Sequence, residues 1–262
     1  MNINEDLKLL FIHVPKCAGK SILKAFNLQK CSVLKRSVVE GVLTEHQFEA
    51  SNKKLSDYIK FGIVRNPWDR LVSLYHFRKR ENDLYNLFPD CNVFGGDKTT
   101  ADGQKLTFKE WIMSPHSKGA EFPQVSRVSQ TTDPAAKMYH PNAFERKDYL
   151  YKMSKQQCNE MYETKAGHLW LTHFLDWIPQ IHFLTRANGE LIVDKVLRFE
   201  NINQDIYKFC EEFNLPQIKL PHINKNPRKK KKYVDYYDDE LLNYIQDYMQ
   251  DDIELLGYKF GD

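Results

Sequence analysis

Residues 9–21 read LLFIHVPKCAGKS, an apolar run that stops at a proline and opens into small, basic and hydroxyl residues. The β-branched and aromatic residues of 9–14 are typical of a buried parallel strand, and Pro15 ends such a strand. Ala18 and Gly19 carry little or no side chain, so backbone N–H groups can closely approach an anion. A helix that begins just after them directs its positive end to the same place. The stretch therefore predicts a phosphate-binding turn, and its further polar candidates are Lys16, Lys20 and Ser21.

The same turn has a competing interpretation as the loop of a nucleotide triphosphatase. Gly19, Lys20 and Ser21 match the second half of the GxxxxGK[ST] motif. The position of the first glycine, however, holds Val14, where that motif needs its tight turn. A strand, turn and helix without any ligand also fit this segment, so the turn alone leaves these alternatives open.

A second segment has the same strand, loop and helix order. Residues 58–64 (YIKFGIV) predict a buried strand, which is followed by RNPWDR and a helical stretch over residues 71–80. Pro67 suits the first turn of a helix. Arg65 lies at the carboxyl end of the strand, and Ser73 follows it by about two helical turns. An arginine fork and a hydroxyl at this spacing could hold one phosphate; the alternative is a salt-bridged arginine beside a surface helix.

Together these two segments resemble the sulfotransferases that use 3'-phosphoadenosine 5'-phosphosulfate. The resemblance is greatest to the carbohydrate branch, which includes the heparan sulfate 2-O and 6-O enzymes and their bacterial relatives. FIHVPKCAGKS is similar to the 5'-phosphosulfate loop of that family, usually PKTAGTS, and FGIVRNPWDRLVSLYHF is similar to its 3'-phosphate motif. Cys17 and Lys20 stand where the family usually has threonines. Later stretches at 175–184, 192–201, 221–237 and 251–260 resemble further landmarks, so the likeness covers nearly the whole chain.

The resemblance implies a set of contacts to the cofactor. The turn after the first strand would hold the 5'-phosphosulfate, and Arg65 with Ser73 would hold the 3'-phosphate. A basic loop near the C-terminal end, here RKKKK at 228–232, would close over the nucleotide. No metal is expected, and the product would be adenosine 3',5'-bisphosphate. The implied cofactor-binding residues are Lys16, Cys17, Ala18, Gly19, Lys20, Ser21, Arg65, Ser73 and Arg228.

Sulfuryl transfer needs positive charge at the leaving oxygen and a base for the proton of the acceptor hydroxyl. Lys16 is the candidate for the first task. His46 is the predicted base, because the 2-O and 6-O enzymes place their histidine in this interval and because imidazole accepts a proton near neutral pH. A histidine that only caps a helix is the structural alternative. Other candidates for the base are Glu45, His173 and Asp176.

The order of the predicted elements indicates an α/β fold with a P-loop-like parallel sheet flanked by helices. In such sheets ligands bind at the carboxyl ends of the strands. We expect one sulfotransferase domain over residues 1–262, with a cofactor core at about 7–82 and 180–235 and a mostly helical acceptor-side region at about 83–179. Further strands are predicted at 181–184 and 193–199, and further helices at 203–213 and 238–256.

Composition narrows the class of protein. Hydrophobic residues make up 42% of the chain, which argues against disorder, and a formal net charge of only +3 does not indicate nucleic-acid binding. The chain has no apolar run long enough for a membrane span, and its polar start, MNINEDLK, does not resemble a secretory signal. We therefore expect a cytoplasmic protein. Five cysteines without a CxxC pair favour reduced thiols over a zinc site or a disulfide scaffold.

These observations lead to one expected activity and two alternatives. The expected activity is transfer of the sulfuryl group to a hydroxyl of an acceptor, with a saccharide as the expected acceptor class. The first alternative is a P-loop kinase or triphosphatase. The second is a non-catalytic nucleotide-binding protein of the same fold. Loops choose acceptors, so the sugar and the sulfated position do not follow from the motifs.

Overall fold

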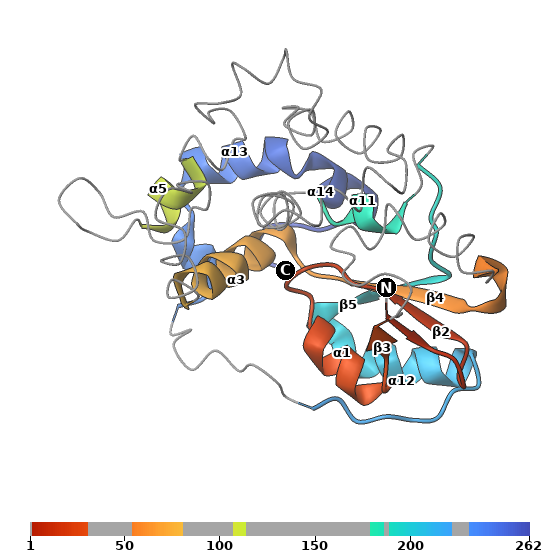
Figure 1. The fold of residues 1–262 in the computed structure, drawn as a ribbon. Coiled ribbons are helices and arrows are strands. Elements are labelled where there is room, and N and C mark those ends of the chain that lie inside the picture. The colour runs from red at the N-terminus through yellow and green to blue at the C-terminus, as the bar shows by residue number, and fades with distance from the viewer. Residues whose placement is uncertain (1, 31–53, 81–106, 114–178, 186–188, 222–230) are drawn as a thin grey trace, which may run out of the picture. The chain divides into compact units, whose positions relative to one another are not determined.

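The computed structural model describes residues 2–30, 54–80, 107–113, 179–185, 189–221 and 231–262 (Figure 1). The chain divides into two compact units. The first unit comprises residues 1–70, 179–232 and 249–262, and the second comprises residues 71–178 and 233–248. A single domain over the whole chain stays a prediction.

The first unit is built on a five-stranded sheet with the strand order β3-β1-β2-β4-β5. Strands β2, β4 and β5 are parallel, with β5 at one edge of the sheet, while the short strands β1 and β3 add antiparallel pairs on the other side. The predicted α/β fold with a parallel sheet is thereby confirmed. The parallel strands bring their carboxyl ends to one edge of the sheet, where ligands bind in folds of this kind. The strands are β1 (Asn2–Asn4), β2 (Leu9–Ile12), β3 (Gln29–Lys30), β4 (Ile59–Val64) and β5 (Lys195–Arg198).

Helices α1 (Gly19–Ala25) and α12 (Ile202–Glu212) cover one face of this sheet (Figure 1). Buried aromatic rings connect these two helices to strand β4. Phe61 on β4 lies 5.6 Å from Phe26, which follows α1, and 4.8 Å from Phe209 on α12, measured between ring centroids. The apolar residues of the two motif strands therefore form the core that holds both helices in place.

The other face of the sheet is covered by α11 (Ile181–Leu184), against which α14 (Gln250–Leu256) packs. Gly62 on β4 faces α11, because successive side chains of a strand point to opposite faces. A Cβ atom at Gly62 would lie only 2.4 Å from Cδ2 of Leu184. The absence of a side chain at this glycine is therefore what lets α11 approach the sheet so closely.

Two predicted elements differ in the structure. Residues 181–184 form a helical turn, so the predicted strand is wrong; a short, fully buried apolar run has no periodicity that separates the two structures. The predicted helix at 238–256 is two helices, α13 (Asp239–Tyr248) and α14, which are separated at the buried Met249. The helix and the strand that were predicted at 203–213 and 193–199 are confirmed as α12 and β5.

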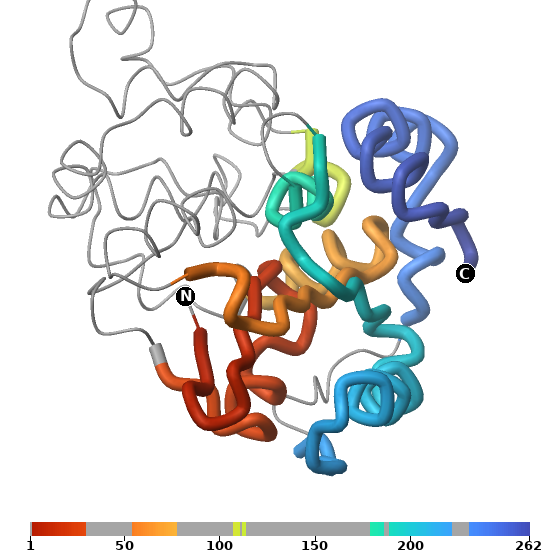
Figure 2. The backbone as a smooth tube through the Cα atoms, turned by 90° about the vertical axis from the view of Figure 1, so that its right-hand side faces the viewer, coloured from red at the N-terminus to blue at the C-terminus, as the bar shows by residue number. Residues whose placement is uncertain are grey.

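Helix α3 (Pro67–Arg80) begins in the first unit directly after β4, and Figure 2 follows this stretch in orange. In the second unit, rings of α3 pack against α5 (Phe108–Met113), with 5.5 Å between the centroids of Tyr75 and Phe108. His76 Nε2 lies 2.7 Å from the hydroxyl of Tyr236. The 3-10 helices are η1 (Leu55–Asp57), η2 (Phe199–Asn201) and η3 (Tyr233–Tyr236).

Across the residues that the structure describes, no helix combines the length and the apolar character that crossing a bilayer demands.

Candidate functional site

The turn between β2 and α1 has an unusual backbone. Lys16 and Ala18 adopt left-handed conformations, with φ angles of 69° and 61°. Such angles are costly for residues with a side chain, and they persist where the surrounding structure imposes them, often at functional sites. The predicted strand, turn and helix are confirmed here, although the shape of the turn comes from a lysine and an alanine rather than from its glycine.

Gly19 has a different role, which is to leave room for a neighbouring ring. A Cβ atom at Gly19 would lie 2.1 Å from Nε2 of His13 and 2.4 Å from its Cδ2. The imidazole therefore rests directly against the start of α1. The hydroxyl-bearing Ser21 is buried in the first turn of this helix, whereas Lys20 is exposed. His13 lies just beyond the end of β2 and not within the strand.

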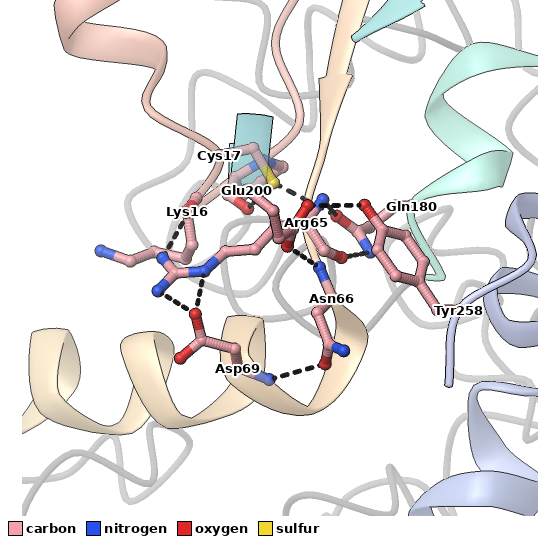
Figure 3. A network of polar contacts seen from close by, with 9 residues as sticks. Lys16, Cys17, Arg65, Asn66, Asp69, Gln180, Glu200 and Tyr258 are labelled. Atoms are coloured by element: carbon pink, nitrogen blue, oxygen red, sulfur yellow. Dashed lines mark hydrogen bonds and ion pairs between the residues drawn. The ribbon is translucent and has the colours of Figure 1, made fainter. Parts of the chain in front are cut away.

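Arg65 connects the two predicted phosphate motifs (Figure 3). Its Nη1 donates a hydrogen bond of 3.2 Å to the backbone carbonyl of Lys16, so the end of β4 contacts the turn after β2. Its Nε and Nη2 both donate to Oδ2 of Asp69, at 2.8 and 2.6 Å. The guanidinium also stacks on Phe199, with 4.2 Å from its central carbon to the ring centroid.

These contacts fix Arg65 without using all its donors. The salt bridge to Asp69 means that the alternative of a paired arginine is present in the structure. Of the five N–H groups of a guanidinium, three are engaged by described residues, and two are left that no described residue engages. Arg65 can therefore both brace the turn and offer a donor to an anion.

Asn66 caps the N-terminus of helix α3. Its side-chain Oδ1 accepts the backbone N–H of Asp69 at 3.3 Å, which is an N-cap ahead of Pro67. Its own backbone N–H donates to Glu200 at 2.6 Å, and its Nδ2 donates to the carbonyl of Lys259 at 3.1 Å. The loop after β4 is therefore held both by η2, which follows β5 and contains Glu200, and by the C-terminal segment.

Gln180 lies behind the turn and is fully buried. Its Oε1 accepts the backbone N–H of Arg65 at 2.8 Å and the thiol of Cys17 at 3.2 Å. Its Nε2 donates to the carbonyl of Arg65 at 2.7 Å and to Oδ2 of Asp252 at 3.0 Å. The carboxamide thus makes all four of the hydrogen bonds of which it is capable.

Two buried charges complete this network. Asp252 on α14 accepts the backbone N–H of Ile181 at 2.9 Å, and Arg70 on α3 donates from Nε to the carbonyl of Pro15 at 3.1 Å. Both side chains have 0% exposure. Burial raises the pKa of Asp252, and the charge of Arg70 and the hydrogen bonds from Gln180 and Ile181 oppose that rise. Opposite charges that are buried in one network offset part of the cost of removing each from water.

The thiol of Cys17 is not activated. Burial raises its pKa to about 12, and the nearby charges of Arg70 and Arg65 lower it only in part. A position near lysines at a helix start could have favoured a thiolate. In the structure Cys17 is instead a small, fully buried residue that fills the turn.

The structure describes most, but not all, of the predicted cofactor residues. Residues 16–21 and Arg65 are brought together in the first unit, and Ser73 lies on α3, one turn beyond Asp69 on the same helix face. Four candidates lie outside the described residues, as does the basic residue expected over the nucleotide. These are His46, Glu45, His173, Asp176 and Arg228.

Sequence reasoning missed the buried polar layer behind the turn. Its members are single polar residues in otherwise unremarkable segments, and they are far apart in the chain. The only local signal is a polar residue at the boundary of an apolar run, as for Gln180 before Ile181, and such a pattern fits a surface position equally well. The missed residues are Arg70, Gln180 and Asp252.

This arrangement can bind an anion but has no metal-binding character in its described part. Lysine, arginine and backbone N–H groups are the donors that bind phosphate and sulfate groups, and they gather where β2 and β4 end. Within residues 2–30, 54–80, 107–113, 179–185, 189–221 and 231–262, no group of three or more His, Cys, Asp or Glu side chains is placed to hold a metal ion.

Comparison with known proteins gives one result. A sequence model described as the sulfotransferase family matches residues 1–259 of the chain, which is nearly its whole length. Comparisons with curated proteins and with solved structures found no significant match. The matched range includes both predicted phosphate motifs and helix α14, whose Asp252 bonds to Gln180 behind the turn.

Proposed function

Because the chain belongs to the sulfotransferase family, we propose that it takes the sulfuryl group of 3'-phosphoadenosine 5'-phosphosulfate and transfers it to the hydroxyl of a saccharide. The observation that carries the proposal is the hydrogen bond from Arg65 Nη1 to the carbonyl of Lys16. It joins the two segments that would hold opposite ends of the nucleotide. A nucleotide with phosphates at both the 3' and the 5' position matches two such segments better than a triphosphate does.

The roles of the residues follow from their places. Backbone N–H groups of residues 18–20 would hold the 5'-phosphosulfate, and the ammonium of Lys16 would neutralise charge on the departing oxygen. Arg65 and Ser73 would bind the 3'-phosphate, with Arg228 covering the nucleotide. His46 would accept the proton of the acceptor hydroxyl. Gly19 contributes to this turn by making room for the imidazole of His13, which a Cβ atom would meet at 2.1 Å.

The donor site is tested by calorimetry with adenosine 3',5'-bisphosphate in EDTA. We expect Arg65→Ala to weaken binding by about 1.5–3 kcal/mol, the range for a hydrogen bond to a charged group. Arg198→Ala is the matched control, because Arg198 ends the neighbouring strand and donates to the carbonyl of Leu256 rather than to the turn. ATP with magnesium is the control ligand. Preference for it, or equal losses in both variants, would refute the donor assignment.

The base is tested separately from the donor site. We expect His46→Ala to lower kcat by about 10²–10⁴-fold, the usual contribution of a general base, with an unchanged affinity for adenosine 3',5'-bisphosphate. An unchanged kcat would transfer the role to Glu45, His173 or Asp176, which the same assay can compare. Transfer is measured from radiolabelled donor to a panel of oligosaccharides, simple glycosides and plain alcohols. A saccharide acceptor is refuted if only the plain alcohols are sulfated.

A further inference from the structure

We propose that Gln180 is the positioning residue of the donor site, which sets how the turn after β2 is aligned with the end of β4. This inference rests on the proposed function, because it concerns the alignment of the two segments that would hold the nucleotide. Gln180 itself is fully buried and touches no ligand position. It acts through the backbone of Arg65 and through Cys17.

The first argument is geometric. Gln180 bonds to both the N–H and the C=O of Arg65, at 2.8 and 2.7 Å, as a neighbouring strand would. The same Oε1 receives the thiol of Cys17 at 3.2 Å. One rigid carboxamide plane therefore fixes the residue that ends β4 and the middle of the turn at the same time.

The second argument is that no other side chain of this length offers the same set of bonds, since the carboxamide of asparagine is one methylene shorter. An amide has two lone pairs and two N–H groups, and here all four are used. Glutamate lacks the donors, lysine lacks the acceptors and methionine lacks both. Substitution would leave the buried N–H and C=O of Arg65 unpaired, and the backbone would have to move to satisfy them.

The third argument concerns what holds Gln180 in turn. Its Nε2 donates to Asp252 at 3.0 Å, and Asp252 also accepts the N–H of Ile181. Helix α14 therefore fixes the direction of the carboxamide. Asp252 is fully buried, and the charge of Arg70 opposes the rise that burial causes in its pKa; Arg70 itself donates to the carbonyl of Pro15 in the turn. The turn is braced from Gln180 on one side and from Arg70 on the other.

The test compares the two buried positions that flank α11. Gln180→Met removes every bond of the carboxamide at nearly constant volume. Thr185→Val, the control, removes a buried hydroxyl that donates to the carbonyl of Ile181 at 3.0 Å. Hydrogen exchange of the ligand-free proteins is followed in the peptide that covers residues 13–21. Calorimetry then gives the Kd for adenosine 3',5'-bisphosphate.

We expect Gln180→Met to accelerate exchange in residues 13–21 at least about tenfold and to raise the Kd for adenosine 3',5'-bisphosphate about 10- to 100-fold, the loss expected when a hydrogen bond to a charged group is displaced. Thr185→Val should match the wild type in both. Normal exchange and affinity in Gln180→Met, or equal effects in both variants, would overturn the proposal. If wild type itself binds no nucleotide, the proposed function fails, and the exchange experiment still decides the role of Gln180.

A second variant guards against loss of folding. Gln180→Glu keeps the shape of the side chain but regains a hydrogen-bond donor only when its carboxyl group is protonated. The carboxylate of Asp252 favours that protonation, whereas the charges of Arg65 and Arg70 oppose it. The thiol of Cys17 stays neutral. The ratio of its Kd to that of wild type should fall as the pH decreases from about 8 to about 5. A ratio that does not change with pH would contradict the positioning role.

Discussion

Gly19→Ala provides a sharp test of the packing at the turn. Gly19 is the first residue of α1, and its φ angle is not in the left-handed range, so alanine fits the backbone there. At such positions alanine stabilises a protein by about 0.4–1 kcal/mol, because it restricts the unfolded chain. Without a neighbour, the substitution would therefore increase the free energy of unfolding.

The neighbour is the imidazole of His13, which would lie 2.1 Å from the new Cβ atom at its Nε2 and 2.9 Å at its Cε1. Contacts this short force a side chain or the backbone to move, and overpacking of this kind costs about 1–3 kcal/mol. The cost exceeds the gain, so Gly19→Ala should lower the free energy of unfolding by about 1–2 kcal/mol.

Removing the ring of His13 should reverse the sign of the effect that Gly19→Ala has on the free energy of unfolding. In a His13→Ala background the clash is absent, and Gly19→Ala should then stabilise the protein by about 0.4–1 kcal/mol. The four proteins of this double-mutant cycle are compared by urea unfolding, followed by both circular dichroism and tryptophan fluorescence to check that the two probes agree. Destabilisation of equal size in both backgrounds would refute the packing argument.

Four further outcomes follow from the same contacts. Asn66→Ala should cost about 0.5–2 kcal/mol in urea unfolding through loss of the α3 cap, and Asn66→Ser, which can still cap, should cost less. Gly62→Ala should cost about 1–3 kcal/mol, with a smaller effect when Leu184 is alanine. Cys17, whose pKa burial raises to about 12, should react slowly with alkylating reagents at about pH 8 until the protein unfolds, as peptide mapping can show. Arg65→Lys should weaken nucleotide binding nearly as much as Arg65→Ala in calorimetry, because lysine has no planar fork. Equal alkylation of native and unfolded protein, or a lysine variant that binds like wild type, would contradict the last two.

The central fold could be predicted from the sequence because its signals are local. The strand at Leu9–Ile12 and the strand at Ile59–Val64 are continuous apolar runs, and Pro67 marks the first turn of the helix that follows. The strand at Asn2–Asn4 was not predicted, since Asn-Ile-Asn has little strand propensity and owes its structure to pairing with β2 and β3. Residues 181–184 were predicted as a strand but are helical, because a run of four apolar residues is too short to show a helical or a strand period.

The candidate site was predictable only in its outer layer. Lys16, Gly19 and Arg65 lie in motifs whose spacing indicates phosphate binding. The bonds from Gln180 and Asp252 join positions far apart in the chain, and no local pattern reveals which buried polar residues will meet. The left-handed backbone at Lys16 was equally hidden, because lysine gives no indication of it and only the packed surroundings impose it.

The long reach of these bonds also determines when the site can form during synthesis. Cys17 and Gln180 are 163 residues apart, and Asn66 meets the carbonyl of Lys259 across 193 residues. A ribosome releases the N-terminal strands long before the segment that contains Asp252 and Lys259. The turn after β2 therefore lacks its closing partners until the segment that contains Asp252 and Lys259 has left the exit tunnel. A stalled or truncated chain that lacks this segment would present both motif strands but could not fix the turn between them.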